Sequence, residues 1–426
     1  MGHYAIVAPP LAGHVNPLVA LGETLIDRGH RVSFLLREDA ASLLGEARIA
    51  PVILKDAAPG DHDRLLRSFG RPHQLLATQR TIAAVAAWAE QLCRQAPALL
   101  RQIGATMVIA DQMEVAGPLV AQIAGLPCVV VATALPTDRE PGIPPIYLGW
   151  NYHAGPFGPW RNRGGYRVVD WLMRPVAEVL RRHADAHGID VADAAGDRCT
   201  TLYQAVSSID FPRRRPSSTM HHVGPLRRDV PAEPPARHEG QAPLIFCSFG
   251  SLQGNRPDLF ARIAEACSTH GAHLVIAHGG LLSEEAEKAL SGMAEVHAFV
   301  PQRRILEQAA VAITHGGFNT VLDALSFGVP LLALPMAFEQ HATAARIRYR
   351  GVGITLPPTA STARLAMAIG GLLTEDRYRQ AAAVVQREIG SAGGVARAAD
   401  IIEREEVRCR IDRAAGERTP CAERRA

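Results

Sequence analysis

Residues 313–323 read Ile-Thr-His-Gly-Gly-Phe-Asn-Thr-Val-Leu-Asp, a run in which a short apolar strand passes into a helix through polar side chains. The first turn of a helix leaves backbone N–H groups without partners and carries the positive end of the helix dipole. A pyrophosphate is held at such a position by geometry and charge together, and the two glycines let it approach the backbone. The stretch therefore predicts a phosphate-binding junction in an α/β fold. Side-chain donors there would come from His315, Asn319 and Thr320.

Short β-branched runs alternate with amphipathic helices on both sides of this stretch. In the first half we expect strands at 4–8, 31–36, 107–110 and 128–132, with helices at 17–27 and about 73–103. In the second half we expect strands at 244–249, 273–277, 294–298, 311–314 and 331–334. Such alternation is typical of parallel, doubly wound sheets, and 426 residues exceed the size of a single core. The sequence predicts two Rossmann-like domains facing across a cleft.

The boundary between these domains is marked by residues 226–243, which are rich in proline and charge and lack apolar periodicity. We therefore expect an N-terminal domain over 1–225, a linker over 226–243, and a nucleotide-binding domain, which contains the phosphate junction, over 244–395. Residues 396–426 are expected to form a helix that returns to the N-terminal domain, followed by a tail.

Composition limits the classes of function. Hydrophobic residues make up 47% of the chain and charged residues 20%, as in a globular protein, and a net charge of +3 is too small to favour nucleic-acid binding. The seven cysteines are scattered and never spaced C-x-x-C, which argues against a zinc site or a disulfide framework. The acidic pair Asp61 and Asp63 lies in a polar loop, so no metal site is predicted there.

The same reasoning bears on location. We expect no signal peptide, because prolines and glycines interrupt the first apolar stretch. The uncharged run 115–137 is divided by Gln122, Gly125 and Pro127 into a helix and a strand, so no membrane span is predicted. We expect a cytoplasmic protein. It either makes no contact with the membrane or binds peripherally at its inner face.

Two polar residues of the first half lie where strands end. His14 follows the first strand within a turn that precedes Pro17, taken here as the first helical residue, and Asp111 follows the strand at 107–110. In a parallel sheet these ends share one edge. A carboxylate beside an imidazole fixes its tautomer and raises its basicity, leaving the other nitrogen to accept a proton. A solvated loop histidine is the alternative for His14.

Further segments carry a resemblance to a known family. The run 313–323, together with Phe-Val-Pro-Gln at 299–302, Gly-Val-Pro-Leu-Leu-Ala-Leu-Pro at 328–335 and Phe-Glu-Gln at 338–340, resembles the nucleotide-sugar signature of inverting UDP-dependent glycosyltransferases of the GT-B fold. Segments at 7–10, 110–114, 134–141, 170–173, 222–227 and 250–254 are similar to bacterial zeaxanthin glucosyltransferases. Departures from the pattern are Phe299 and Phe318 in place of tryptophan and Asp323 in place of the commoner glutamate.

The resemblance implies an enzyme that transfers glucose from UDP-glucose to the hydroxyls of a carotenoid such as zeaxanthin, without a metal or other cofactor. It implies His14 as general base with Asp111 as its partner. In the donor site His315, Asn319 and Thr320 would hold the diphosphate, Asp323 the ribose, and Glu339 with Gln340 the sugar. The remaining implied donor residues are Ser251, Phe299, Val300, Gln302, Gly316 and Gly317.

Aromatic residues crowd into one proline- and glycine-rich stretch: Tyr147, Trp150, Tyr152, Phe157, Trp160, Tyr166 and Trp171. Either they fill a core beneath a long loop, or they form an apolar acceptor channel or a lip that touches a bilayer. The triplet Arg213-Arg214-Arg215 is interpreted as a solvated basic turn rather than a lipid contact.

Rival functions remain open at this point. The chain could glycosylate a macrolide or another secondary metabolite from a UDP- or dTDP-sugar. It could also be a non-catalytic sugar-nucleotide-binding protein, or a sugar-nucleotide epimerase.

Overall fold

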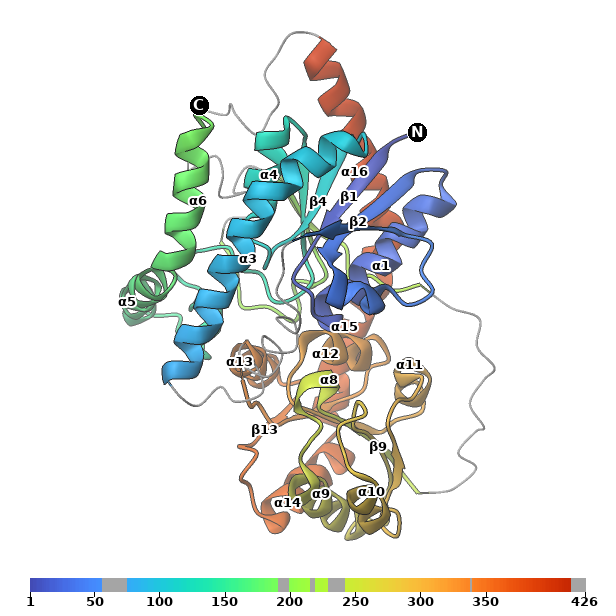
Figure 1. Ribbon diagram of the computed structural model, residues 1–426. Coiled ribbons are helices and arrows are strands. Elements are labelled where there is room, and N and C mark those ends of the chain that lie inside the picture. Colours follow the sequence, from blue (N-terminus) through green and yellow to red (C-terminus); the bar gives the residue numbers. More distant parts are fainter. Residues whose placement is uncertain (56–74, 191–198, 215–218, 229–241, 338, 415–426) are drawn as a thin grey trace.

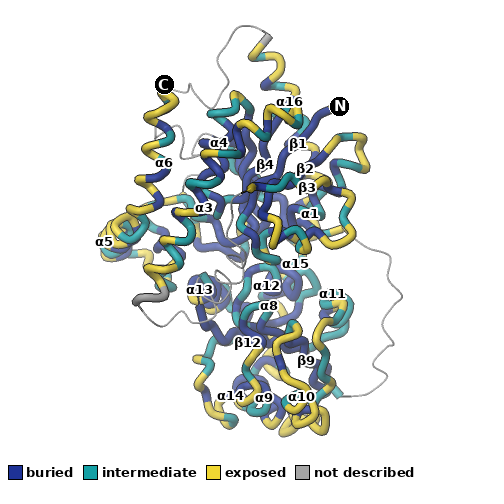
Figure 2. The backbone as a smooth tube through the Cα atoms, viewed as in Figure 1, coloured by how far each residue is buried: buried dark blue, intermediate teal, exposed yellow. Residues whose placement is uncertain are grey.

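The computed structural model describes residues 1–55, 75–190, 199–214, 219–228, 242–337 and 339–414. Figure 1 shows two α/β units, one above the other, and the sheets form the buried layers of both (Figure 2). The two-domain, doubly wound fold class predicted from the sequence is confirmed. The pair Asp61 and Asp63 lies outside the described residues.

The N-terminal sheet has seven parallel strands in the order β3-β2-β1-β4-β5-β6-β7. The order reverses between β1 and β4, and ligands of open α/β sheets bind at such a switch point. The strands are β1 (His3–Val7), β2 (Arg31–Arg37), β3 (Ala50–Leu54), β4 (Met107–Asp111), β5 (Cys128–Ala132), β6 (Thr200–Tyr203) and β7 (Met220–His222). The helices are α1 (Ala12–Asp27), η1 (Glu38–Leu44), α3 (Leu75–Gln102), α4 (Gly117–Ala124), η2 (Ile146–Leu148), α5 (Phe157–Leu172) and α6 (Arg174–Ala186).

The C-terminal sheet has six parallel strands in the order β10-β9-β8-β11-β12-β13, and its switch point lies between β8 and β11. The strands are β8 (Leu244–Ser248), β9 (His273–Ala277), β10 (Glu295–His297), β11 (Val311–Thr314), β12 (Leu331–Ala333) and β13 (Gly353–Thr355). The helices are α8 (Gly250–Gln253), α9 (Pro257–Ser268), α10 (Glu284–Leu290), α11 (Gln302–Leu306), α12 (Phe318–Ser326), α13 (Gln340–Arg350), α14 (Thr362–Thr374) and α15 (Asp376–Ala392).

The last described helix, α16 (Gly394–Ala414), lies beside α1 and β1 of the N-terminal unit (Figure 1). Ala398 and Ile402 are fully buried in the same cluster as Leu18. The hydroxyl of Tyr4 donates to Glu406 at 2.6 Å, so a buried polar group of β1 is satisfied from α16. The C-terminal segment thus completes the core of the N-terminal unit.

Helix α1 begins at Ala12, so the prediction that Pro17 is the first helical residue is wrong. Proline inside a helix lacks the N–H that would bond the carbonyl four residues earlier, here that of Gly13. The Gly13 carbonyl accepts a bond from the side chain of Asn319 instead, at 2.7 Å. His14 consequently lies in the first turn of α1 and not in a free loop.

The predicted linker also starts too early. Leu226 is fully buried, and Arg227 and Arg228 both form ion pairs with folded residues. The sequence predicted a linker from residue 226 because the segment is rich in proline and charge. The partners of Arg227 and Arg228 lie in distant segments and could not be recognised from the sequence.

An ion-pair cluster joins the two units on the side of α13. The Asp210 carboxylate accepts from Arg213 at 2.8 Å and from Arg346 of α13 at 2.6 Å. Burial alone would raise the pKa of Asp210, but the two arginines outweigh it and hold the pKa at about 2. The side chain of Arg213 is 9% exposed, so the interpretation of this arginine as part of a solvated turn is wrong.

Within the described residues, no helix is both long enough and apolar enough to span a bilayer. No disulfide joins the six cysteines among them.

Candidate active site

His14 and Asp111 meet at the switch point of the N-terminal sheet. Nδ1 of His14 lies 3.0 Å from Oδ2 of Asp111 and 2.8 Å from the hydroxyl of Thr133. Thr133 also donates to the same carboxylate oxygen, and the backbone N–H of Met113 donates to the other at 2.7 Å. Asp111 is 1% exposed and fixed on both oxygens, so Nδ1 of His14 carries its proton toward the carboxylate and Nε2 is left to accept one.

The carboxylate sets the basicity of this histidine. Burial opposes protonation of His14, but the charge and hydrogen bond of Asp111, helped by Glu339, outweigh burial and raise the pKa of His14 above its ordinary value. A base with a pKa near neutrality is the kind that accepts a proton efficiently as a hydroxyl group attacks.

A second acid, Glu114, lies near the pair without joining it. It is 3% exposed and accepts a hydrogen bond from the indole of Trp88 at 2.5 Å. Burial raises the pKa of Glu114 to about 8, against the effect of the Trp88 bond. Glu114 is therefore protonated at neutral pH and leaves Asp111 as the charged partner of His14. Nothing in the local sequence indicated that Thr133 bonds to His14 and Asp111, or that Glu114 is a buried acid beside them.

The predicted phosphate junction lies at the switch point of the C-terminal sheet. Gly317 is the N-cap residue of α12, and Gly316 has a φ of 88°, a conformation that favours glycine. A Cβ atom at Gly317 would stand 2.5 Å from Nε2 of His315. The glycines thus make room for the imidazole beside the N-terminus of α12.

His315 acts here as a neutral group. Burial lowers its pKa to about 4, with a backbone hydrogen bond near Ser248 opposing the shift. Its contribution to a bound diphosphate would be a hydrogen bond and not a full charge. The electrostatic part of anion binding is then left to the helix N-terminus.

The two residues predicted for diphosphate and ribose are already held by neighbours. Asn319 donates to Gly13 across the domains, and its Oδ1 accepts from Arg227 at 2.9 Å. Asp323 accepts from Arg227 at 2.8 Å and from Gln302 at 2.8 Å. Gln302 and Asp323, both predicted to contact the donor, thus lie side by side. Arg227 did not figure among the residues predicted from the sequence.

The pair predicted to bind the sugar, Glu339 and Gln340, lies at the start of α13. Burial raises the pKa of Glu339, and its charge contributes to the raised pKa of His14, so the two side chains lie near each other. Gln340 uses Oε1 to accept from the backbone N–H groups of Met336 and Ala337, at 2.9 and 2.8 Å. Gln340 therefore holds Met336 and Ala337, which precede α13, through its side-chain oxygen.

The other predicted donor residues take varied positions. Ser251 is exposed in the first turn of α8, and Thr320 is buried at 8% exposure in the first turn of α12. Phe299 is 74% exposed beside Gly280, with a free ring face suited to stacking on a base, and Val300 is half-buried next to it.

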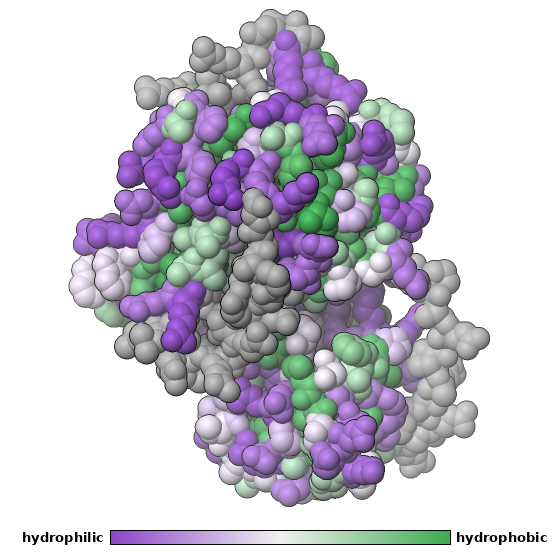
Figure 3. Space-filling view, viewed as in Figure 1, coloured by the Kyte–Doolittle hydropathy of each residue, from purple (hydrophilic) through white to green (hydrophobic). Residues whose placement is uncertain are grey.

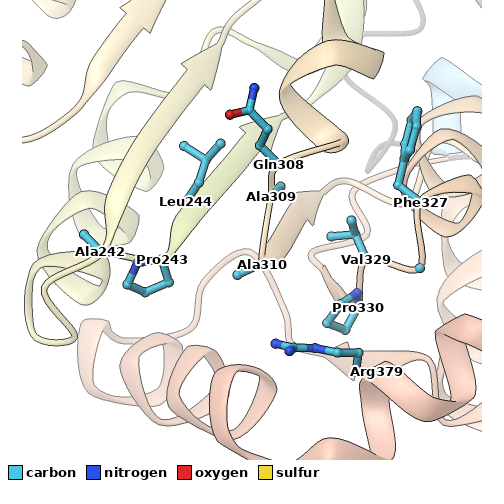
Figure 4. A pocket seen from close by; sticks show the side chains of 11 residues that line it. Ala242, Pro243, Leu244, Gln308, Ala309, Ala310, Phe327, Val329, Pro330 and Arg379 are labelled. Atoms are coloured by element: carbon cyan, nitrogen blue, oxygen red, sulfur yellow. The ribbon is translucent and has the colours of Figure 1, made fainter. Parts of the chain in front are cut away.

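A separate pocket of about 390 Å³ lies at the opposite edge of the C-terminal sheet. Its walls include Leu244, Ala310 and Pro330, at the amino ends of β8, β11 and β12. Figure 4 shows the Arg379 side chain beneath Ala310 and Pro330. Because the predicted donor residues follow the carboxyl ends of these strands, this pocket is not part of the site.

The fold and the facing sites define a class, the two-domain glycosyltransferases that use a nucleotide sugar. Residues 270–403 match the family described as erythromycin biosynthesis protein CIII-like, C-terminal domain. The chain is 38% identical to a zeaxanthin glucosyltransferase of Pseudescherichia vulneris, over 95% of this chain and 98% of that one. It is 37% identical to a zeaxanthin glucosyltransferase of Pantoea ananas, over 95% and 96% of the two chains.

Among solved structures, the calicheamicin glycosyltransferase is similar with a TM-score of 0.76 and 26% identity, covering 95% of this chain and 98% of that one. These findings confirm the resemblance seen in the sequence. The chain belongs to the family of UDP-dependent glycosyltransferases with the GT-B fold, in the group that contains these zeaxanthin glucosyltransferases.

Proposed function

We propose that the protein transfers glucose from UDP-glucose to the hydroxyl groups of a hydroxylated carotenoid such as zeaxanthin, giving a monoglucoside and then a diglucoside. The observation that carries the proposal is the His14–Asp111 pair: its histidine lies near Glu339 and follows Gly13, which accepts a hydrogen bond from Asn319 in the first turn of α12. The similarity to two zeaxanthin glucosyltransferases over nearly the full chain supports the choice of acceptor.

The reaction follows from these positions. The acceptor oxygen attacks C1 of glucose while its proton passes to Nε2 of His14, which Asp111 holds in the required tautomer. The bond between C1 and the UDP oxygen breaks at the same time on the opposite face, so an α-linked donor gives a β-glucoside. Backbone N–H groups at the start of α12 and the His315 side chain stabilise the charge on the departing diphosphate without a divalent cation. Asp111 and His14 together supply a rate factor of roughly 10² to 10⁴, and positioning supplies the rest.

The test uses purified protein with UDP-glucose and zeaxanthin, analysed by mass spectrometry. The expected products are mono- and diglucosides, and His14→Ala should lose most turnover while it keeps its affinity for UDP. His187→Ala, at an exposed position of the same domain, is the matched control and should leave turnover unchanged. Full turnover in His14→Ala would refute the assignment of the base.

The second candidate is a macrolide or similar secondary-metabolite glycosyltransferase, which the match to an erythromycin biosynthesis family favours. Assays that cross both acceptors with UDP- and dTDP-sugars separate the two. UDP release from UDP-glucose without acceptor would exclude a protein that only binds the donor, and a changed sugar with no conjugate would indicate an epimerase.

We also propose a cytoplasmic location with peripheral contact to an anionic membrane surface through α5. Four apolar side chains of this helix are at least half exposed, namely Phe157, Trp160, Val168 and Trp171. Their spacing places them along one helical face, and the exposed Arg163, Arg167 and Arg174 flank it. Figure 3 shows this corner at the left, where pale residues adjoin hydrophilic ones.

An acceptor that dissolves in lipid needs such an approach. A groove of about 460 Å³ runs between α5 and η2, with Leu148, Trp150 and Trp160 in its walls. Arg161 covers the Trp150 ring at 4.8 Å. Tyr147, the residue before the groove-lining Leu148, lies near Glu339, which supports a route for the acceptor from this groove toward His14.

A further inference from the structure

Arg227 reaches from the N-terminal domain into the predicted donor site. Its Nε atom donates to Oδ1 of Asp323 at 2.8 Å, and one terminal nitrogen donates to Oδ1 of Asn319 at 2.9 Å. The other terminal nitrogen donates to Oε1 of Gln204 at 3.0 Å and to the carbonyl of Leu226 at 3.0 Å. The guanidinium thus uses all three of its nitrogens on named acceptors.

We infer that Arg227 is a positioning residue of the donor site, which holds the Asp323 carboxylate where it can accept bonds from the ribose hydroxyls of a nucleoside diphosphate sugar. The inference rests on the proposed function, because it requires a nucleotide donor in this cleft. It concerns a residue that acts through Asp323, and not one that touches the reacting atoms.

The geometry of the carboxylate supports this role. Arg227 holds Oδ1 of Asp323 and Gln302 holds Oδ2, so the plane of the group is fixed. Arg303 also lies near Oδ1, at 3.6 Å, which is beyond hydrogen-bond distance, so an acceptor site remains on each oxygen for a ribose hydroxyl. The pair of Arg227 and Asp323 is well sheltered, with side chains that are 17% and 8% exposed, and the bond from Nε to Oδ1 is charge-assisted and directional.

The short side chain of Asp323 makes its orientation by Arg227 important for ribose binding. Aspartate is one methylene shorter than glutamate, so Asp323 extends less far from α12 toward a ligand. The Asp323 side chain has fewer rotamers than a glutamate would have, and its hydrogen bond with the Arg227 guanidinium holds it in one of them. A glutamate could adjust its carboxylate toward the ribose by itself, whereas the Asp323 carboxylate is oriented by Arg227 of the N-terminal domain.

Arg227 also connects the donor site with the catalytic pair. Gln204, its partner, donates to the carbonyl of Thr133 at 2.9 Å, and the hydroxyl of Thr133 contacts both His14 and Asp111. All of these groups except Asp323 and Asn319 belong to the N-terminal domain. The arginine thus contacts both Asp323 and Asn319 from the acceptor-side framework, whereas the bonds that involve Gly13 and Gln204 reach Asn319.

The next residue provides a matched control. Arg228 forms ion pairs with two acids, at 2.8 Å to Glu23 and 2.8 Å to Asp27, and both lie on α1 of its own domain. Replacing Arg228 removes the same charge and a similar number of contacts one residue away, without reaching the donor site.

The experiment measures calorimetric affinities of full-length protein for UDP and for 2′,3′-dideoxy-UDP, which lacks the ribose hydroxyls. The unmodified protein should prefer UDP. Arg227→Ala should weaken UDP binding by about 10- to 100-fold, the range for loss of hydrogen bonds to a charged group, and leave the dideoxy affinity within about threefold. The preference for UDP should therefore collapse. Arg227→Lys, which keeps the charge without the fork, should recover only part of it, and Arg228→Ala should bind both ligands as the unmodified protein does.

Other outcomes overturn the inference. Equal weakening of both ligands would mean that Arg227 contacts phosphate or merely maintains the fold, and thermal unfolding of Arg227→Lys would identify the latter. Unchanged or tighter UDP binding in Arg227→Ala would mean that the arginine does not support the donor. Absence of UDP binding by the unmodified protein would instead refute the proposed function.

Discussion

The side-chain amide of Asn319 donates to the main-chain carbonyl of Gly13 at 2.7 Å, across the two domains. The carbonyl is available because Pro17, four residues further along α1, has no N–H to offer it. Pro17 therefore leaves the Gly13 carbonyl, next to His14, free to accept a hydrogen bond, and Asn319, a predicted diphosphate residue, donates that bond.

This relationship predicts a coupling between two substitutions. Asn319→Ala should lower the thermal midpoint of the nucleotide-free protein, because it leaves the Gly13 carbonyl without its partner, at a cost of about 1 kcal/mol. In a Pro17→Ala background the new N–H of residue 17 can bond that carbonyl, so the loss caused by Asn319→Ala should be smaller. Scanning calorimetry of the four proteins measures the coupling, and strictly additive effects would contradict it.

The pH dependence of turnover should report the His14–Asp111 pair. The rate should rise with pH as Nε2 of His14 loses its proton, with a midpoint above the ordinary histidine value of about 6.5. Asp111→Asn removes the charge and leaves burial unopposed, so the midpoint should move below about 6.5 while the maximal rate falls by roughly 10² to 10⁴. Thr133→Val keeps the carboxylate and serves as the control. An Asp111→Asn profile with an unmoved midpoint would exclude Asp111 as the source of the shift.

The same raised pKa affects stability. The folded protein binds the His14 proton more tightly than the unfolded chain does, so the stabilisation is complete below the unfolded pKa and is lost as pH rises through the folded one. The difference in unfolding free energy between the unmodified protein and His14→Gln should shrink over that interval in urea titrations.

Glu114 should give a stability effect with its own pH range. Its pKa rises from 4.5 to about 8 through burial, so the folded state holds a proton that the unfolded chain releases. Stability should therefore fall as pH rises from 4.5 toward about 8, by roughly 3 to 5 kcal/mol in total. Glu114→Gln, which is neutral at every pH and still accepts from Trp88, should lack this fall. Glu178→Gln, at an exposed position of α6, is the control, and parallel pH curves for the unmodified protein and Glu114→Gln would count against the buried proton.

The α5 surface should bind vesicles. Co-sedimentation with vesicles containing anionic lipid should fall at least several-fold in Trp160→Ser/Trp171→Ser, because tryptophan rings bind at the membrane interface. Binding should also weaken as salt screens the arginines. Met367→Ser changes a side chain that is 73% exposed on α14 of the other domain and should have no effect. Equal loss in both variants would argue against a localised contact.

Much of the fold was accessible from local sequence. The central strands are continuous apolar runs because both faces of a parallel sheet are covered, and β5, β9 and β11 were predicted with their observed bounds. The glycine-rich start of α12 was recognisable because its chemistry lies within one turn of chain. The strand ends placed His14 and Asp111 at one edge of the sheet, and the family resemblance implied that they form a pair.

The sequence by itself thus determined two Rossmann-like domains, the family, and the residues contributed by single strand-to-helix junctions. Only the tertiary structure decided that α1 starts before His14, that Thr133 and Glu114 lie near His14 and Asp111, and that Arg227 pairs with Asp323. The physical reason is distance along the chain. A backbone pattern is set by neighbours within a few residues, whereas the partner of a charged or amide side chain is chosen by segments that meet only when the two domains pack, such as Arg227 and Asp323.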